Sequence, residues 1–122
     1  MSAYLKQELA WAAGFFDGEG STVFVTMKSY KGRRYPHLRM QVCQAEPLTL
    51  RRFNAAVRGL GKVSGPYHSP SHHGKTTWQW RVYARDSVQA VALYLWPYLS
   101  QPKRDQMERA IERYREFKCP LS

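Results

Sequence analysis

Residues 9–21 change from a helical to an extended pattern across the run Asp17-Gly18-Glu19-Gly20. Before this run, apolar residues recur at helical spacing, at Leu5, Leu9, Ala13 and Phe16. After it, residues 22–26 are rich in β-branched side chains, which favour a strand. Gly18 and Gly20 stop a helix and permit backbone angles that other residues resist. The sequence therefore predicts a helix that ends at two glycines and leads directly into a strand, with two carboxylates at the junction.

The predicted helix has a face of small residues. Ala10 and Gly14 lie one helical turn apart, with Ala13 beside them, and small residues at this spacing let a second helix approach backbone to backbone. The acids Asp17 and Glu19 face the negative end of the helix dipole, so they need a neutralising partner, and a bound divalent cation provides one. The residue types alone leave an alternative open, in which both acids only cap and turn the chain.

The charge of the chain indicates a polyanionic partner. It has 19 Lys and Arg residues against 9 acids, a formal net charge of +10, and such an excess repels itself unless a polyanion is bound. A merely soluble basic protein is the alternative. The apolar share of 43% is that of an ordinary globular protein, and 122 residues suffice for a core. We expect one domain over residues 1–122.

Cysteine usage and hydropathy exclude several protein classes. Cys43 and Cys119 are too few and too far apart for a disulfide framework or a zinc motif. No apolar run approaches the roughly 18 residues of a membrane span, and residues 1–6 lack the apolar region of a signal peptide. We expect an intracellular protein with no membrane partner and no small-molecule substrate.

Strict alternation of apolar and polar residues predicts two further strands. In one, the apolar set is Leu38, Met40 and Val42, and in the other it is Trp78, Trp80 and Val82. We expect both sets, including the tryptophans, in the core. A short strand is expected at residues 62–64. In the first strand the apolar residues 23–25 are consecutive, so its inward side stays undetermined.

Three later segments have helical patterns. Glu46-Pro47 opens a helix whose apolar stripe is Leu50, Phe53 and Val57. Asp86 resembles the cap of the next helix, with Gln89 as its capping-box partner. The last helix starts at residues 101–104, and its polar face sets Asp105 one turn before Arg109. The resulting order is α-β-β-α-β-β-α-α, an α+β fold with a four-stranded antiparallel, saddle-shaped sheet and its helices on one face.

The other face of this sheet is predicted to bind double-stranded DNA. Strands fit the major groove, where Arg and Gln suit bidentate contact with base edges. The face and the loops at its ends carry Lys31, Arg33, Arg34, His37, Arg39, Gln41, Lys62, Lys75, Thr77, Gln79 and Arg81. The loop 67–76 adds three histidines, but no cysteine or acid joins them at ligand spacing, so contact with phosphate or bases is favoured over zinc.

Hydrolysis of both strands of a duplex needs two acidic junctions, and one chain supplies one. Carboxylate-bound metal ions provide an activated water and neutralise phosphate charge. A symmetric dimer through the first helix brings two junctions together. We assign Ala10, Ala13, Gly14 and Asp17 to that interface. The target of such a dimer is pseudo-palindromic.

Residues 12–20, Ala-Ala-Gly-Phe-Phe-Asp-Gly-Glu-Gly, resemble the signature of the LAGLIDADG homing endonucleases. The later elements follow the family's pattern over most of the chain, which has the length of its single-motif members. The resemblance implies a homodimer that makes double-strand breaks at a long DNA target with Mg²⁺, in the homing of an intron or intein. It also implies that Mn²⁺ or Ca²⁺ can substitute in binding.

The resemblance also implies roles for individual residues. Glu19 matches the catalytic, metal-binding acid, where Asp is commoner, and the carbonyl of Gly18 is a second metal ligand. Residues 41–44 match a segment that makes Gln44 a catalytic residue that orders water. Lys103 matches the basic residue near the scissile phosphate, with Arg104 as a rival after a one-residue insertion. The resemblance implies three more roles. Asp17 is a mainly structural acid, and either Arg51 or Arg52 is a second basic residue of the active site. Val23, Val25 and Met27 lie on the DNA-facing side of the first strand.

Two other functions compete with this one. The same fold can serve as an RNA maturase or as a DNA-binding protein that does not cleave, although the acid at Glu19 with Gln44 and Lys103 favours the enzyme. A general RNA-binding protein is the third possibility, and it lacks an aromatic-rich segment for stacking single-stranded bases.

Overall fold

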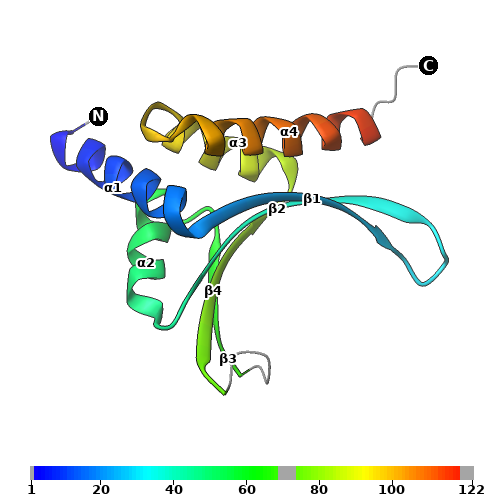
Figure 1. Ribbon diagram of the computed structural model, residues 1–122, viewed down its shortest axis with the longest axis horizontal. Helices are drawn as coiled ribbons and strands as arrows, with labels where there is room; N and C mark the ends of the chain where they lie inside the picture. The colour runs from blue at the N-terminus through cyan, green and yellow to red at the C-terminus, as the bar shows by residue number, and fades with distance from the viewer. Residues whose placement is uncertain (1, 69–73, 119–122) are drawn as a thin grey trace.

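The computed structural model describes residues 2–68 and 74–118. Its helices and strands follow the predicted α-β-β-α-β-β-α-α order, with one short turn of 3₁₀ helix, η2, before the last helix (Figure 1). The elements are α1 (Ala3–Glu19), β1 (Gly20–Lys28), β2 (Arg34–Gln44), α2 (Pro47–Ala56), β3 (Lys62–His68), β4 (Thr76–Tyr83), α3 (Arg85–Leu95), η2 (Trp96–Tyr98) and α4 (Gln101–Lys118).

The four strands form one antiparallel sheet in the order β1-β2-β4-β3. Figure 1 shows that the sheet is strongly curved, that α3 and α4 cover its convex face, and that the concave face carries no helix. The predicted α+β class and the placement of helices on one face are therefore confirmed. Among the helices in the described part of the chain, none combines the length and apolar character needed to cross a membrane.

The core lies between the convex face and the helices. The inward residues of β2 and β4 are those that alternation predicted, and Met40 and Trp80 are fully buried. The stripe of α2 is also confirmed, because Leu50, Phe53 and Val57 are 0% exposed. Phe53 packs edge-on against Trp80, with ring centroids 4.7 Å apart. These contacts fix the sheet to the helices and leave its polar side outward.

The structure decides the facing of β1, which the residue pattern left open and for which the family resemblance implied an orientation. Phe24 points toward the helices, where its ring lies 6.4 Å from that of Tyr114 in α4. Val23, Val25 and Met27 therefore lie on the concave face, and Val25 and Met27 are 37% and 40% exposed. A long aromatic residue gains more from burial than a valine does, and this selects the inward side.

The end of α1 differs from the prediction. The helix continues through Gly18 and ends at Glu19, and Gly20 has an extended φ of −95°, which any residue adopts. Gly20 is needed for a different reason: a Cβ there would lie 2.2 Å from Cδ2 of Phe16. The ring of Phe16 is fully buried and stacks on Phe53. The glycine therefore lets the strand leave the helix directly over a fixed ring.

Gly20→Ala is expected to destabilise the fold by about 1–3 kcal/mol, the usual cost of overpacking a core, because the buried Phe16 ring cannot move aside. Gly18→Ala is the matched control. Its added methyl meets nothing within 4 Å, and alanine in a helix gains up to about 1 kcal/mol over glycine. Denaturant midpoints measure both, and equal midpoints for the two variants would contradict the packing argument.

Two helix details also correct the sequence reading. Asp86 does not cap α3, which begins at Arg85 after Ala84, and Ala84 carries no capping side chain. The chain reaches that start through a φ of 74° at Ala84, whose carbonyl accepts from the amide of Val88. In α4, Asp105 accepts a hydrogen bond from Gln101 at 2.8 Å instead of pairing with an arginine one turn later.

Candidate nucleic-acid interface and active site

The concave face carries polar side chains in rows that cross the sheet. Ser21, Gln41, Arg81 and Lys62 are register partners from β1 to β3. Side chains alternate between the faces of a strand, so this row lies opposite the buried Met40 and Trp80. The next row contains Cys43, Gln79 and Ser64. The structure thus brings together donors and acceptors from segments about 20 residues or more apart in sequence.

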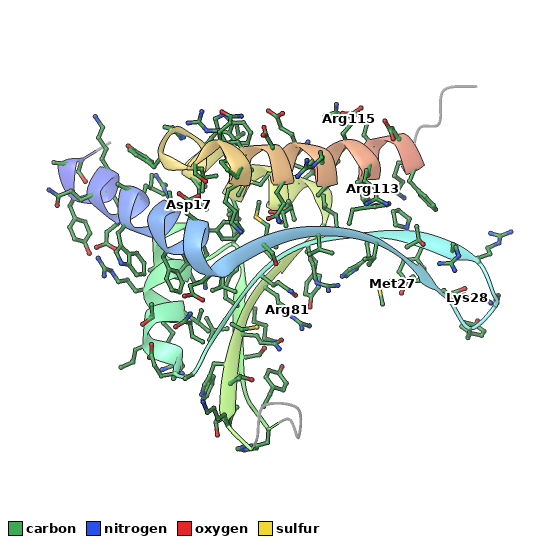
Figure 2. The ribbon with its side chains drawn as sticks, in the orientation of Figure 1. Asp17, Met27, Lys28, Arg81, Arg113 and Arg115 are labelled. Carbon is green, nitrogen blue, oxygen red and sulfur yellow. The ribbon has the colours of Figure 1, made fainter. Side chains whose placement is uncertain are left out.

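The arginines of the concave face are held by their polar neighbours. Nε of Arg39 donates to Oε1 of Gln41 at 3.0 Å, and the guanidinium of Arg81 donates to the hydroxyl of Tyr83 at 3.3 Å. Nε of Arg81 is buried and has no hydrogen-bond partner among the described residues. Figure 2 shows Arg81 and Met27 on the open side of the sheet. Such pre-positioned guanidinium groups suit bidentate contact with a base edge.

His37 is the one histidine of this face in the described residues with a shifted pKa. Burial lowers its pKa below the ordinary 6.5, and the positive charges of Arg39 and Arg81 lower it further. The imidazole is therefore uncharged at neutral pH and offers one donor and one acceptor. Its ring lies 5.3 Å from that of Tyr83. His37 contributes hydrogen bonding to this face and not positive charge.

Three of the basic residues predicted to contact DNA lie at the edges of the concave face, and a fourth, Arg34, does not. Lys31 and Arg33 are exposed in the turn between β1 and β2, and Lys62 is exposed at the start of β3. Arg34 instead begins β2 on the convex side, where its guanidinium donates to Oγ1 of Thr26 at 2.8 Å. It has the same parity as Leu38, so alternation turns it away from the concave surface.

Glu19 and Gln44 come together at one end of the sheet, beside the first helix. They line a pocket of about 350 Å³ formed where α1 ends, β2 ends and β4 begins. Thr77 and Lys75 line it too, with Cys43, Ala45 and Thr76. The sequence assigned Lys75 only to DNA binding, because nothing in its local pattern reveals that it shares a pocket with the acid of a helix that ends 56 residues earlier.

Lys103 and Arg104 take different places, which separates the two rivals. The ammonium group of Lys103 donates to the carbonyl oxygen of Gly20, at the junction of α1 and β1, and lies 5.9 Å from the ring centroid of Phe16. Arg104 points the other way, where its Nε donates to the carbonyl oxygen of Trp96 at 3.0 Å. Of these two residues, Lys103 is the one whose charge lies next to Gly20, directly after Glu19.

Asp17 joins α1 to the start of α4. Its carboxylate accepts hydrogen bonds from the amide of Ser100 at 3.1 Å and from the hydroxyl of Ser100 at 2.9 Å. The positive N-terminus of α4 therefore compensates this acid, and it needs no cation. Through these bonds Asp17 links two helices of its own chain. Glu19, by contrast, is exposed at the end of its helix.

The small-residue face of α1 is narrower than predicted. Ala13 is 0% exposed within its own chain, so its assignment to a dimer interface is wrong. It lies on the stripe of Leu9 and Phe16 and packs in the core with them. Ala10 and Gly14 are exposed, and a Cβ added at Gly14 would meet nothing within 4 Å. This open strip of backbone is available to another helix.

The donors at the junction suit a hard divalent cation. Glu19 supplies an exposed carboxylate, Gly18 a backbone carbonyl, and Gln44 in the same pocket an amide oxygen. Oxygen ligands of this kind are those of Mg²⁺ and Ca²⁺ and not of a structural zinc. Within residues 2–68 and 74–118, no three His, Cys, Asp or Glu residues cluster as a metal site. His72, His73 and Cys119 lie outside the described residues.

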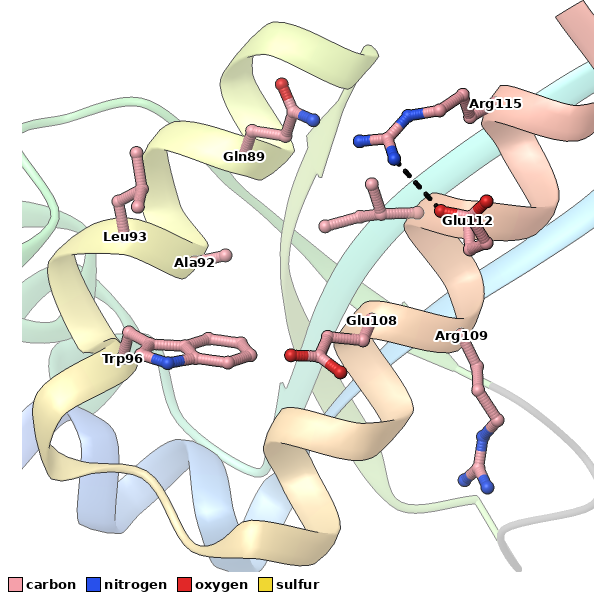
Figure 3. A pocket seen from close by; sticks show the side chains of 9 residues that line it. Gln89, Ala92, Leu93, Trp96, Glu108, Arg109, Glu112 and Arg115 are labelled. Atoms are coloured by element: carbon pink, nitrogen blue, oxygen red, sulfur yellow. Dashed lines mark hydrogen bonds and ion pairs between the residues drawn. The ribbon is translucent and has the colours of Figure 1, made fainter.

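A larger hollow lies elsewhere and contains none of the predicted site residues. It measures about 800 Å³ and runs between α3 and α4, with Trp96 and Ala92 on one side and Glu108 on the other (Figure 3). Glu112 pairs with Arg115 at its edge at 2.9 Å. This groove is formed by the helices, whereas Glu19, Gln44 and the polar rows belong to the sheet and its ends.

Comparison with known proteins shows what the fold resembles. No protein-family model matches the chain, and no curated protein matches its sequence. Among solved structures, the homing endonuclease I-CvuI in complex with its target and calcium superposes with a TM-score of 0.77 at 20% identity, over 97% of this chain and 72% of that one. The LAGLIDADG homing endonuclease I-GzeII in complex with a DNA target gives 0.70 at 13% identity, over 93% and 38%.

A third neighbour is the group I intron-encoded homing endonuclease I-CeuI complexed with DNA, with a TM-score of 0.67 at 16% identity, over 92% of this chain and 56% of that one. At these identities the likeness concerns the fold. The helix order and the single curved sheet are the features that this shared fold covers. The chain therefore has the fold of the LAGLIDADG homing endonucleases.

Proposed function

We propose that this chain is a site-specific DNA endonuclease that acts as a homodimer and makes double-strand breaks at a long, pseudo-palindromic target with Mg²⁺. The observation that carries the proposal is the position of Glu19, an exposed carboxylate where a polar, concave sheet meets its first helix. The solved neighbours I-CvuI, I-GzeII and I-CeuI, which share the fold, are complexes with DNA. Homing of an intron or intein is the process in which such an enzyme acts.

The concave face has the chemistry that recognition of a duplex needs. Gln41, Arg39 and Arg81 lie near its centre and can hydrogen-bond base edges in the major groove. Lys31 and Arg33 in the turn between β1 and β2, and Lys62 on the edge strand β3, are exposed cations that can meet phosphates. With a net charge of +10, binding should weaken steeply as salt rises.

The junction supplies the groups for hydrolysis. Glu19 and the carbonyl of Gly18 would hold Mg²⁺, which neutralises phosphate charge and lowers the pKa of a bound water. Gln44 lies in the same pocket and can orient that water by hydrogen bonding. Lys103 places a positive charge at the carbonyl of Gly20, one residue past Glu19, where it can stabilise the charge that develops on the phosphate.

The homodimer follows from the number of junctions. One chain carries one acid of this kind, and a two-stranded break needs two sites. The exposed Ala10 and Gly14 leave room for the α1 helix of a second copy. Two sheets would then extend in opposite directions along the groove, and this arrangement requires a target with two related halves.

A selection for cleaved sequences from a randomised plasmid library tests the function. The purified protein with Mg²⁺ is expected to linearise a subset of plasmids that share a pseudo-palindromic site, and chelation of the metal is expected to stop the reaction. Tight, sequence-specific binding to that site without any cleavage would indicate a DNA-binding protein instead. Tight binding to structured RNA alone would indicate a maturase.

Lys103→Met and Arg104→Met are expected to differ. Lys103→Met removes the charge at the junction, and loss of one electrostatic group of this kind costs roughly 10²–10³-fold in cleavage rate. Arg104→Met removes a contact with the carbonyl of Trp96 and should leave the rate within about threefold. Single-turnover cleavage at saturating protein measures both, and a larger loss for Arg104→Met would transfer the role to that residue.

A further inference from the structure

The outer part of the concave face is apolar along one strand. Val23, Val25 and Met27 alternate on β1, and Val25 and Met27 are 37% and 40% exposed. Their register partners on β2 are polar or aromatic: Arg39, His37 and Tyr35. The hydroxyl of Tyr35 donates to Sδ of Met27 at 3.9 Å. A surface for double-stranded DNA would be polar throughout if it bound only phosphates and hydrogen-bonding edges, so this apolar row needs its own ligand.

Strand geometry gives this row a position along the duplex. Residues of an antiparallel strand rise about 3.4 Å each, which matches the spacing of about 3.4 Å between successive bases of a DNA strand. Val23 and Met27 follow Glu19 by four and eight residues in the chain. On a duplex whose groove follows this strand, they would lie over bases about four to eight positions outward from the phosphate beside Glu19. The rows nearer the junction, with Gln41 and Arg81, lie over more central positions.

The major groove offers one apolar group to such a row. Base edges there present donors and acceptors, except for the C5-methyl group of thymine; 5-methylcytosine carries the same group. An aliphatic side chain against a hydrogen-bonding edge leaves that edge unsatisfied, which is unfavourable. Met27 adapts to several shapes because its side chain is flexible, whereas Val25 is stiff, so the preference should be sharpest opposite Val25.

We propose that β1 reads C5-methyl groups, so that each half-site of the target is rich in thymine about four to eight positions outward from the cleaved phosphate. The polar partners on β2 meet the other base of each pair. His37 is uncharged there, because its pKa is lowered by burial and by two arginines, and it can hydrogen-bond an adenine edge. This inference rests on the proposed function, since it names the sequence class that the same surface recognises.

A binding selection from randomised duplexes, in Ca²⁺ without Mg²⁺, tests it without requiring cleavage. We expect thymine to dominate in the outer window of each half-site. Replacing each window thymine by deoxyuridine removes only the methyl group and is expected to weaken binding about fourfold per methyl. The same replacement at central positions, under the Gln41 and Arg81 row, should change binding less than about twofold.

A second pool made with 5-methylcytosine in place of cytosine separates the two sources of the methyl group. Thymine is expected to remain dominant, because its pair with adenine also suits the polar partners on β2. Enrichment of 5-methylcytosine beside thymine would also support methyl contact. Preference for unmodified cytosine or guanine in the window would overturn the inference, as would deoxyuridine binding as well as thymine.

Val25→Gln supplies a protein-side test. Glutamine suits adenine through bidentate bonding, so the selected base opposite residue 25 is expected to change from thymine to adenine. Leu93→Gln is the matched control, because this leucine is 74% exposed on α3, in the helix layer. The base preferences selected by this variant should equal those of the wild type. Circular dichroism checks that both variants fold. An unchanged profile for Val25→Gln would contradict the inference.

These experiments distinguish a failure of the thymine preference from a failure of the proposed endonuclease function. If the protein binds no duplex in either pool, the proposed endonuclease fails and the inference fails with it. If it binds and cleaves a defined site that has no thymine preference in the outer window, the proposed endonuclease function is supported. Only the proposal that β1 contacts C5-methyl groups is then overturned.

Discussion

Glu19→Gln is expected to abolish cleavage while DNA binding persists. The amide keeps the size of the side chain but loses the negative charge that would hold Mg²⁺ at the junction. Metal ions contribute several kcal/mol to the stabilisation of the transition state, and each 1.36 kcal/mol is about a factor of ten in rate. We therefore expect a loss of about 10³-fold or more. Glu19 is exposed at the end of α1, so the substitution should not disturb folding.

Glu108→Gln is the control for this variant. It makes the same chemical change on α4, in the groove formed with α3, and should cleave at the wild-type rate. Plasmid linearisation measures cleavage, and a gel-shift assay in Ca²⁺ measures binding. If Glu19→Gln cleaved within about tenfold of the wild type, another acid would have to hold the metal, and the assignment of the active site to this junction would be wrong.

Gly14→Leu is expected to separate the dimer into folded monomers. Within one chain, nothing lies within 4 Å of the position of an added Cβ, and leucine is a better helix former than glycine. In a symmetric dimer the larger side chain intrudes twice, and overpacking costs about 1–3 kcal/mol each time. The dissociation constant should therefore rise roughly 30- to 10⁴-fold.

Analytical ultracentrifugation measures the dimer, and thermal unfolding at low protein concentration measures the monomer. Gly14→Ala should show the same two effects at a smaller size, because it adds one methyl group to the same strip. Double-strand cleavage should fall in parallel with dimerisation. A Gly14→Leu protein that sediments as an unaltered dimer would move the interface away from this face of α1.

The two variants test separate parts of the proposal. Glu19→Gln removes chemistry from a dimer that should still assemble on DNA, whereas Gly14→Leu removes assembly from chains whose junctions remain intact. Mixing Glu19→Gln chains with wild-type chains is informative for the same reason. A mixed dimer of wild-type and Glu19→Gln chains is expected to nick one strand, because it retains one complete acidic junction.

Much of the fold was predictable from periodicity. Alternation in residues 38–42 and 78–82 assigned an inward and an outward face to β2 and β4, and the 3.6-residue stripe of α2 identified its buried side. A two-residue or 3.6-residue period is a property of neighbouring residues, and burial of one face rewards it directly. The same alternation predicts His37, Arg39 and Arg81 on the open face, which is where their strands carry them.

Periodicity could not assign the buried side of an element where neighbouring residues were alike, or where a residue fitted two faces of one helix. Three consecutive apolar residues left β1 without a facing until Phe24 met the aromatic side chains of α4. The helical pattern allowed two positions for Ala13, on the small-residue face or on the apolar stripe with Leu9. Only the packing showed that Ala13 belongs to the stripe and is buried in the core.

The sequence by itself determined the element order, the facing of β2 and β4, and the acidic junction between α1 and β1. The tertiary structure decided which residues share that junction. Asp17 meets Ser100 across 83 residues, Lys103 reaches Gly20 across the same separation, and Lys75 lies in one pocket with Glu19. Such contacts leave no periodic trace in the chain, because they depend on how whole helices and strands pack and not on the spacing of neighbouring side chains.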